Sequence, residues 1–146
     1  DARAGFFGIS PHTTRAELQR AVFEGLAFAI VDALQGYPQG GELYLTGGGA
    51  ASATWLQIIA DCTGRTVVSS AFNELSARGA AILAARSVAA LAETPPLAQT
   101  RYQPRPQAHA RYAALYPVYR LLREQMLPVW QARQAALQPL SQDLQP

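Results

Sequence analysis

The sequence predicts an α/β fold organised around a parallel strand–helix–strand unit. Two short segments of strand-like composition, 42–46 and 66–69, are separated by a stretch whose apolar residues recur at helical spacing, and another helical stretch follows. Strands and helices that alternate in this way form parallel pairs, with helices on the faces of the sheet. The 146 residues suffice for one domain with a buried core.

The first helix begins at a capping box, which Thr14 forms with Glu17 three residues later. Apolar residues then recur at helical spacing, and turn residues in 36–41 end the helix. We therefore expect a helix from Arg15 to about Gln35. Residues 26–31 are apolar on every side, so both sides of that half should be covered.

The parallel unit begins with the strand 42–46, which three consecutive glycines, 47–49, bring to an end. Ser52 or Thr54 can cap the helix that follows, because both side chains can accept a hydrogen bond from a first-turn N–H. Gly64 ends that helix, as glycine commonly does.

The second strand of the unit, 66–69, leads into a third helix from about Ser76 to Ala92, which is rich in alanine. Prolines between 95 and 106 then mark a loop, since proline cannot continue a helix or donate to a sheet.

A last helix should pack back on the domain through one apolar face. The residues of this face recur in steps of three and four: Tyr112, Leu115, Tyr116, Tyr119, Leu122, Met126 and Trp130. Pro117 should kink this helix and Pro128 should interrupt it. The polar segment 138–146 should be a disordered tail, which leaves residues 1–137 as the folded segment.

Composition excludes several classes of function. The net charge is +2, and all 12 basic residues are arginines that form no run or stripe, which argues against a nucleic-acid partner. Without lysine, the chain cannot supply the lysine of a Walker motif or of a Schiff base. The longest apolar run, 26–31, is too short to cross a membrane, so no membrane partner is expected.

Cysteine and histidine are too few for metal chemistry. Cys62 is alone, and His12 and His109 lie far apart without partners at ligand spacing. We therefore expect no metal ligands in this chain and interpret all three residues as structural. A single cysteine also favours a reducing, cytoplasmic compartment.

The three glycines 47–49 are the feature that carries chemistry. Glycine accepts positive φ and lets a backbone approach a flat or anionic ligand closely. The start of the following helix offers unpaired N–H groups, which favour phosphate. This corner lies at the carboxyl end of a parallel strand, where such folds bind nucleotides. From these residues alone, nucleotide binding and simple tight packing stay equally open.

Three motifs resemble the FGGY family of carbohydrate kinases. Residues 4–9 and 17–24, separated by seven residues, resemble the family's second signature at every constrained position. The sequence Thr-Gly-Gly-Gly-Ala-Ala-Ser at 46–52 is similar to its adenosine motif, and 74–81 is similar to the segment that follows that motif. The resemblance covers about residues 4–119, and the short ketose and pentulose kinases, xylulokinase-like, are the members it resembles most.

The resemblance implies the later part of the family's C-terminal domain, an actin-like and ribonuclease-H-like ATPase fold. The whole enzyme would transfer the γ-phosphoryl group of ATP, with Mg²⁺, to a hydroxyl of a sugar or polyol, xylulose or a related pentulose foremost. The N-terminal kinase domain of the same protein would close on this segment. A homodimer is compatible with the resemblance.

The resemblance also assigns nucleotide-binding residues. Gly48, Gly49 and Ala50 would carry the backbone that lies against the adenosine and the α-phosphate of ATP. Gly47 belongs to the same corner, and Ser52 would lie near the adenine.

Other positions depart from the family or lack its chemistry. Ala51 stands where a larger polar residue is common, so a side-chain contact there is lost. No aspartate of this chain matches a catalytic position, and the catalytic aspartate is expected outside the chain, so this segment alone should be inactive. Asp61 should cap a helix or bond at the surface, and Glu74 is the acidic residue nearest the expected ligand side.

Two other interpretations remain open. The chain could belong to a non-catalytic relative that binds a nucleotide or a partner. It could also be a structural helical module that uses the aromatic face between Tyr112 and Trp130 as an interface, which an exposed aromatic stripe would favour.

Overall fold

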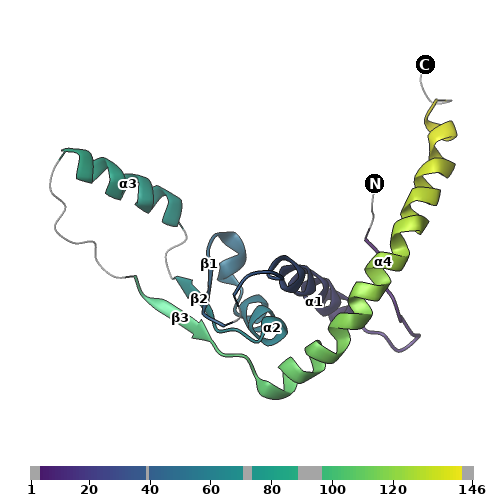
Figure 1. Cartoon of the computed structure of the whole chain (residues 1–146), viewed down its shortest axis with the longest axis horizontal. Helices are drawn as coiled ribbons and strands as arrows, with labels where there is room; N and C mark the ends of the chain where they lie inside the picture. The colour runs from purple at the N-terminus through teal and green to yellow at the C-terminus, as the bar shows by residue number, and fades with distance from the viewer. Residues whose placement is uncertain (1–3, 39, 71–73, 89–96, 143–146) are drawn as a thin grey trace.

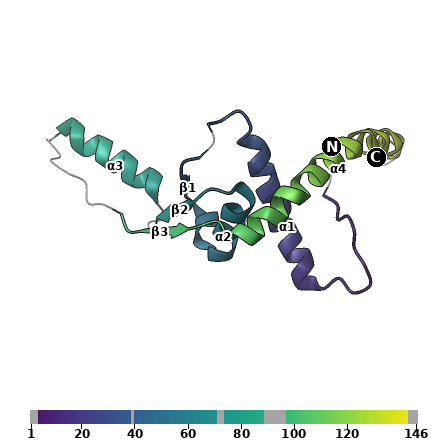
Figure 2. The ribbon, with the colours of Figure 1, turned by 60° about the horizontal axis from the view of Figure 1, so that its bottom comes forward.

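The computed structural model describes residues 4–38, 40–70, 74–88 and 97–142, with side chains as far as residue 137. In chain order the elements are α1 (Arg15–Ala33), β1 (Leu43–Leu45), the 3₁₀ turn η1 (Gly48–Ala51), α2 (Ala53–Thr63), β2 (Val67–Ser70), α3 (Leu75–Val88), β3 (Gln99–Tyr102) and α4 (Pro106–Gln142). Figure 1 shows a small core, from which α3 and the far end of α4 project on opposite sides. Figure 2 shows the same arrangement from a second direction.

The sheet confirms the predicted parallel unit. β1 and β2 pair in parallel, with Leu43 opposite Val67. β2 lies in the middle, in the order β1-β2-β3, and its first three residues are buried. α2 connects the two parallel strands and packs on β2, so the strand–helix–strand order has the expected geometry.

β3 was not predicted, because the segment between the prolines was expected to be a loop. It pairs antiparallel with β2, placing Val67 opposite Tyr102 and Ser70 opposite Gln99. The strand is mostly exposed and has the polar sequence Gln-Thr-Arg-Tyr, so it lacks the apolar alternation of a strand that covers a core. Its position at the edge of the sheet allows prolines so close to it in sequence.

The predicted capping box at the start of α1 is confirmed. The Glu17 main-chain N–H donates to Thr14 Oγ1 at 3.3 Å, and the Thr14 N–H donates to Glu17 Oε2 at 2.7 Å. Of the apolar stretch 26–31, Ala27 and Phe28 are buried, while Leu26 is half-exposed. The expectation that this half is covered on all sides is therefore wrong for Leu26 and for Ala29, which are both exposed.

α2 begins and ends where the sequence indicates. Ser52 is the N-cap, and its Oγ accepts from the Trp55 main-chain N–H at 3.3 Å. Gly64 ends the helix in the left-handed conformation at φ 67°, and its N–H donates to the Ala60 carbonyl at 2.9 Å. A Cβ at Gly64 would lie 2.6 Å from His109 Cε1, so the first turns of α4 pass directly over this point.

The core lies where α1, α2, β2 and the start of α4 meet. Its buried residues are Ala27, Phe28, Leu56, Ile58, Ile59, Ala60, Cys62, Val67 and Tyr112. The Phe28 ring lies 5.9, 5.9 and 5.2 Å from the rings of Tyr112, Tyr116 and Tyr119. This aromatic cluster confirms that the tyrosines of the predicted face pack back on the domain, and it argues against their role as a free interface. Leu115 of the same face is exposed, so the prediction is wrong there.

α4 is continuous where an interruption was expected. The helix passes Pro117 and Pro128 without a break and reaches Gln142. Its first half is held against α1 and α2 by packing, which outweighs the local cost of proline. The expected tail begins at residue 138, whereas the helix continues to Gln142, and residues 143–146 lie outside the described residues.

The third helix begins at Leu75, one residue before the expected start, and it is described as far as Val88. The expected continuation to Ala92 lies outside the described residues. In the parts of the chain that the structure describes, no helix combines the length and apolarity needed to span a membrane.

Candidate functional site

The corner formed by Gly47, Gly48 and Gly49 lies at the carboxyl end of β1, directly before α2. β2 runs parallel to β1, so its last residue, Ser70, lies at the same edge of the sheet. α3 starts beyond that edge, after Glu74, whose main-chain carbonyl accepts from Arg78 N at 3.0 Å. The carboxyl edge of parallel strands is the place where open α/β folds form their ligand sites.

The backbone of the corner depends on glycine at one position. Gly47 has φ 83° and ψ −172°, a conformation that residues with a Cβ rarely adopt. The chain then makes a 3₁₀ turn from Gly48, closed by a hydrogen bond of 3.0 Å from Ala50 N to the Gly47 carbonyl. The N–H groups of Gly48 and Gly49 open this turn, and within the described residues they donate to no main-chain acceptor.

The surface above the corner is open. Gly47, Gly48 and Gly49 are all exposed, and a Cβ added at Gly47 or Gly48 would meet no atom within 4 Å. A Cβ at Gly49 would lie 3.6 Å from Trp55 Nε1. The half-buried Trp55 in turn packs on Phe23, with ring centroids 5.5 Å apart. Gly49 therefore lies against the Trp55 ring, while Gly47 and Gly48 present bare backbone to the outside.

The remaining predicted residues complete the same turn. Ala50 is half-buried and packs against the core, so it fixes the inner side of the corner. Ser52 is exposed and uses its oxygen as the cap of α2, which leaves its hydroxyl hydrogen free to donate to a ligand. Ala51 is exposed and offers no polar group. The arrangement can thus offer main-chain donors and one hydroxyl to a polar or anionic ligand.

Two hollows among the described residues lie elsewhere. One of about 550 Å³ is lined by residues of α1 and the start of α4. Another of about 430 Å³ is lined by the N-terminal segment, α1 and the middle of α4. The glycine corner is instead an exposed surface, which needs a second surface opposite it to enclose a ligand.

The described residues do not fit a resident metal ion. Nowhere within residues 4–38, 40–70, 74–88 and 97–137 do three or more His, Cys, Asp or Glu side chains come together in a way that could hold one. Cys62 is buried in the core, and burial raises the pKa of its thiol to about 12, so it stays protonated and unreactive.

A buried anchor between α2 and α4 escaped the sequence analysis. Asp61 has no exposed surface, and its carboxylate accepts hydrogen bonds from the Arg105 N–H at 2.8 Å and from Arg105 Nη2 at 2.6 Å. Gln57 Nε2 donates to the same carboxylate at 3.0 Å and to the Gln103 carbonyl at 2.9 Å. His109 Nδ1 lies 2.9 Å from the Asp61 carbonyl.

Asp61 therefore joins α2 to Arg105, the residue that precedes α4, through a hydrogen-bonded ion pair inside the core. Of the two roles expected for it, surface hydrogen bonding is wrong because the side chain is buried, and α2 is capped by Ser52 and Gly64 instead. Burial alone would raise the pKa of Asp61, but the hydrogen bonds from Arg105 and Gln57 outweigh it and hold the pKa below its usual value. The available signal was a single acidic residue within the apolar face of a helix, four residues after Gln57.

Comparison with known proteins extends these observations. Residues 1–88 match the profile of the C-terminal domain of the FGGY family of carbohydrate kinases. A probable L-xylulose kinase of Pasteurella multocida is 33% identical over 125 residues, covering 82% of this chain and 26% of that protein. An erythritol kinase of Brucella abortus is 34% identical over 140 residues, covering 89% of this chain and 27% of that protein.

The fold is also similar to that of a solved structure. The crystal structure of xylulose kinase from Rhodospirillum rubrum superposes with a TM-score of 0.74 at 29% identity, covering 89% of this chain and 28% of that one. The chain thus spans about a quarter of the length of the relatives it matches.

Proposed function

The chain belongs to the FGGY family of carbohydrate kinases and has a mixed α/β, actin-like fold. From this membership we propose that it holds the adenosine end of ATP in a sugar or polyol kinase. The whole enzyme would transfer the γ-phosphoryl group of ATP to a hydroxyl of its substrate. Relatives named as L-xylulose, xylulose, glycerol and erythritol kinases support a sugar or polyol as the substrate, and xylulose or a related pentulose is our first choice. We place such an ATP-consuming enzyme in the cytoplasm.

The open glycine corner is the observation that carries this proposal. Among the described residues, the N–H groups of Gly48 and Gly49 donate to no main-chain acceptor at the start of an exposed helical turn, where they could meet the α-phosphate. The absence of a Cβ lets the flat adenosine approach the main chain. Trp55 lies against Gly49 on the inner side of the corner.

The contribution of this chain is positioning. Phosphoryl transfer depends mainly on holding the phosphates and the acceptor hydroxyl in line and on stabilising charge. We propose that residues 1–137 form one surface of the nucleotide cleft and that the N-terminal kinase domain of the same protein closes the other side. The catalytic aspartate would come from that other part, so the chain alone would bind nucleotide without transferring phosphate.

Mg²⁺, when bound, would neutralise charge on the transferring phosphates. Because the described side chains form no metal-holding group, we assign its ligands to the nucleotide and to residues outside this chain.

The test is Gly48→Val in the full-length protein. A Cβ at position 48 meets no atom of the chain and φ there is not positive, so the substitution leaves the corner folded but covers it. We expect KM for ATP to rise at least about tenfold, equivalent to losing roughly 1.4 kcal/mol of binding, while KM for the sugar stays constant.

The matched control is Gly79→Val, which places the same side chain on α3 at a glycine that is also free of neighbours within 4 Å. It should leave both constants unchanged. If Gly48→Val raised KM for the sugar and spared ATP, the corner would belong to the other substrate and the assignment would fail.

A panel of ketoses, pentoses and polyols separates the kinase from the non-catalytic relative. If the protein is a kinase, at least one compound of the panel should be phosphorylated, with consumption of ATP. Nucleotide binding by the full-length protein without turnover on any member of the panel would favour the non-catalytic alternative.

A further inference from the structure

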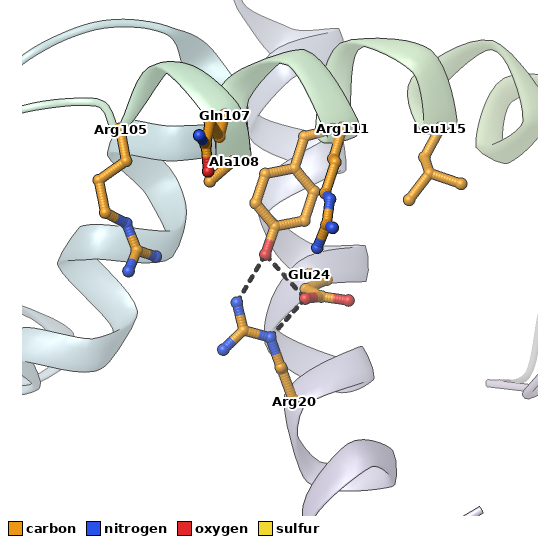
Figure 3. A pocket seen from close by; sticks show the side chains of 8 residues that line it. Arg20, Glu24, Arg105, Gln107, Ala108, Arg111 and Leu115 are labelled. Atoms are coloured by element: carbon orange, nitrogen blue, oxygen red, sulfur yellow. Dashed lines mark hydrogen bonds and ion pairs between the residues drawn. The ribbon is translucent and has the colours of Figure 1, made fainter.

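A hollow of about 550 Å³ between α1 and the first turns of α4 gathers three arginines (Figure 3). Arg20 enters it from α1, Arg105 from the residue before α4, and Arg111 from α4 itself. It lies on different elements from the glycine corner, and its chemistry is independent of the function proposed above.

Arg20 is held in place by two partners. Its Nε donates to Glu24 Oε1 at 2.7 Å, and its Nη2 donates to the Tyr112 hydroxyl at 2.8 Å. Tyr112 in turn donates to Glu24 Oε1 at 2.7 Å, which closes the triangle drawn in Figure 3. Burial, followed by the hydrogen bond to Glu24, raises the pKa of Tyr112 to about 12, so the hydroxyl remains a proton donor.

Arg105 is held from the other side of the hollow. Its Nε and Nη2 donate to Asp61 Oδ2 at 3.0 and 2.6 Å, so the buried carboxylate fixes the orientation of the guanidinium. The side chain is nevertheless 59% exposed. A guanidinium has five N–H donors, so Arg105 and Arg20 each keep donors that these bonds do not use.

Arg111 differs from both. It is exposed, and within the described residues it has no hydrogen bond and no ion pair. Figure 3 shows its side chain directed into the hollow, toward the side of Glu24. The lining therefore holds three positive charges and the single negative charge of Glu24. The buried Asp61, which does not line the hollow, forms an ion pair with Arg105.

We propose that this hollow binds a small phosphate monoester. Two fixed guanidiniums with spare donors and a third that is free suit a dianion with three acceptor oxygens. Because Arg20 and Arg105 are already oriented, binding costs little side-chain entropy at those two positions. The apolar side chains of Ala108 and Leu115 line the same hollow and provide a wall for the carbon skeleton of the ester.

The experiment measures inorganic phosphate binding to the full-length protein by calorimetry, at constant ionic strength balanced with chloride. Arg111→Ala should weaken phosphate binding about tenfold or more, because it removes the charge-assisted donors that no protein group shares. Arg133→Ala removes the same charge from an exposed position of α4 outside the hollow and should leave the affinity unchanged.

Arg111→Lys provides a second variant that keeps the charge and loses the planar fork. Its affinity should fall between those of the wild type and Arg111→Ala. Equal phosphate affinity in the wild type and in Arg111→Ala would overturn the proposal, because binding would then occur at another site such as the nucleotide cleft.

The other candidate occupant is an acidic side chain from elsewhere in the full-length protein. In that case phosphate would not bind, and Arg111→Ala would lower the melting temperature by breaking an ion pair. Either result would overturn the proposal, which requires phosphate binding and an unchanged melting temperature for Arg111→Ala in the absence of phosphate.

Discussion

At the scale of single residues, a substitution at Gly47 should affect folding stability, whereas one at Gly48 should affect ligand binding. Gly47 has a positive φ and open space around it, so the only cost of adding a Cβ there is backbone strain. Gly48 has neither strain nor neighbours, so a side chain there affects only what lies outside the corner. Two adjacent glycines thus have different physical reasons to be glycine.

Gly47→Ala should therefore destabilise the protein by about 1–3 kcal/mol, the cost of holding a residue with a Cβ at positive φ and extended ψ. Gly48→Ala, which adds the same methyl group one residue later, should be close to neutral. Comparing their melting temperatures tests this distinction. Equal melting temperatures for the two variants would show that the corner relaxes out of the positive-φ conformation.

Asp61→Asn should lower stability by about 2 kcal/mol at neutral pH. It removes the negative charge that Arg105 binds, and it turns one acceptor oxygen into an NH₂ donor that faces other donors. Since the folded pKa of Asp61 is depressed, this contribution is complete above the unfolded pKa and is lost as pH falls through the folded value. The difference between wild type and variant should therefore shrink below about pH 4. A difference that stayed constant from pH 7 to pH 3 would contradict the charged anchor.

At the scale of elements, the first turn of α1 rests on its capping box. Thr14→Ala removes the acceptor for the Glu17 N–H and should destabilise the helix by about 1 kcal/mol. Thr14→Ser keeps the hydroxyl and should retain most of the stability. Amide hydrogen exchange in the first turn of α1 should accelerate in the alanine variant only; faster exchange in both variants would assign the effect to the lost methyl group instead.

The sequence allowed the elements with local end signals to be predicted. α1 and α2 have caps that a few neighbouring residues determine, and the parallel pairing followed from the strand–helix–strand order. β3 and the continuity of α4 could not be predicted in this way. β3 depends on pairing with β2 across the sheet, and α4 continues past Pro117 while its tyrosines pack on Phe28. Both are decided by contacts distant in sequence, which outweigh local preference.

The same distinction between local and distant contacts decides which parts of the candidate sites could be predicted. The glycine corner is visible in the sequence because all its residues are consecutive and glycine has a distinct conformational meaning. Asp61 with Arg105, and Arg20 with Tyr112, combine residues that lie 44 and 92 positions apart, so only the folded chain brings them together. Nucleotide binding at the corner stays a prediction for the experiments above.

At the scale of the whole molecule, the position of α4 depends on the aromatic cluster around Phe28. Phe28→Ala removes the ring that the three tyrosines contact and should cost about 3–5 kcal/mol. Because the ring joins two helices, hydrogen exchange should increase both in α1 and in the tyrosine-bearing turns of α4. Phe28→Leu keeps most of the volume and serves as the milder control. An increase confined to α1 would show that α4 is held by other contacts.

The contact between Gly64 and His109 has a consequence for how this protein can vary. The reversal of the chain after α2 demands a residue without a Cβ, and the imidazole crossing above it leaves no room for one. A single methyl group would therefore both resist the turn and force the His109 ring to move. A change at residue 64 is therefore expected to require a matching change at residue 109, although the two positions lie in separate helical segments.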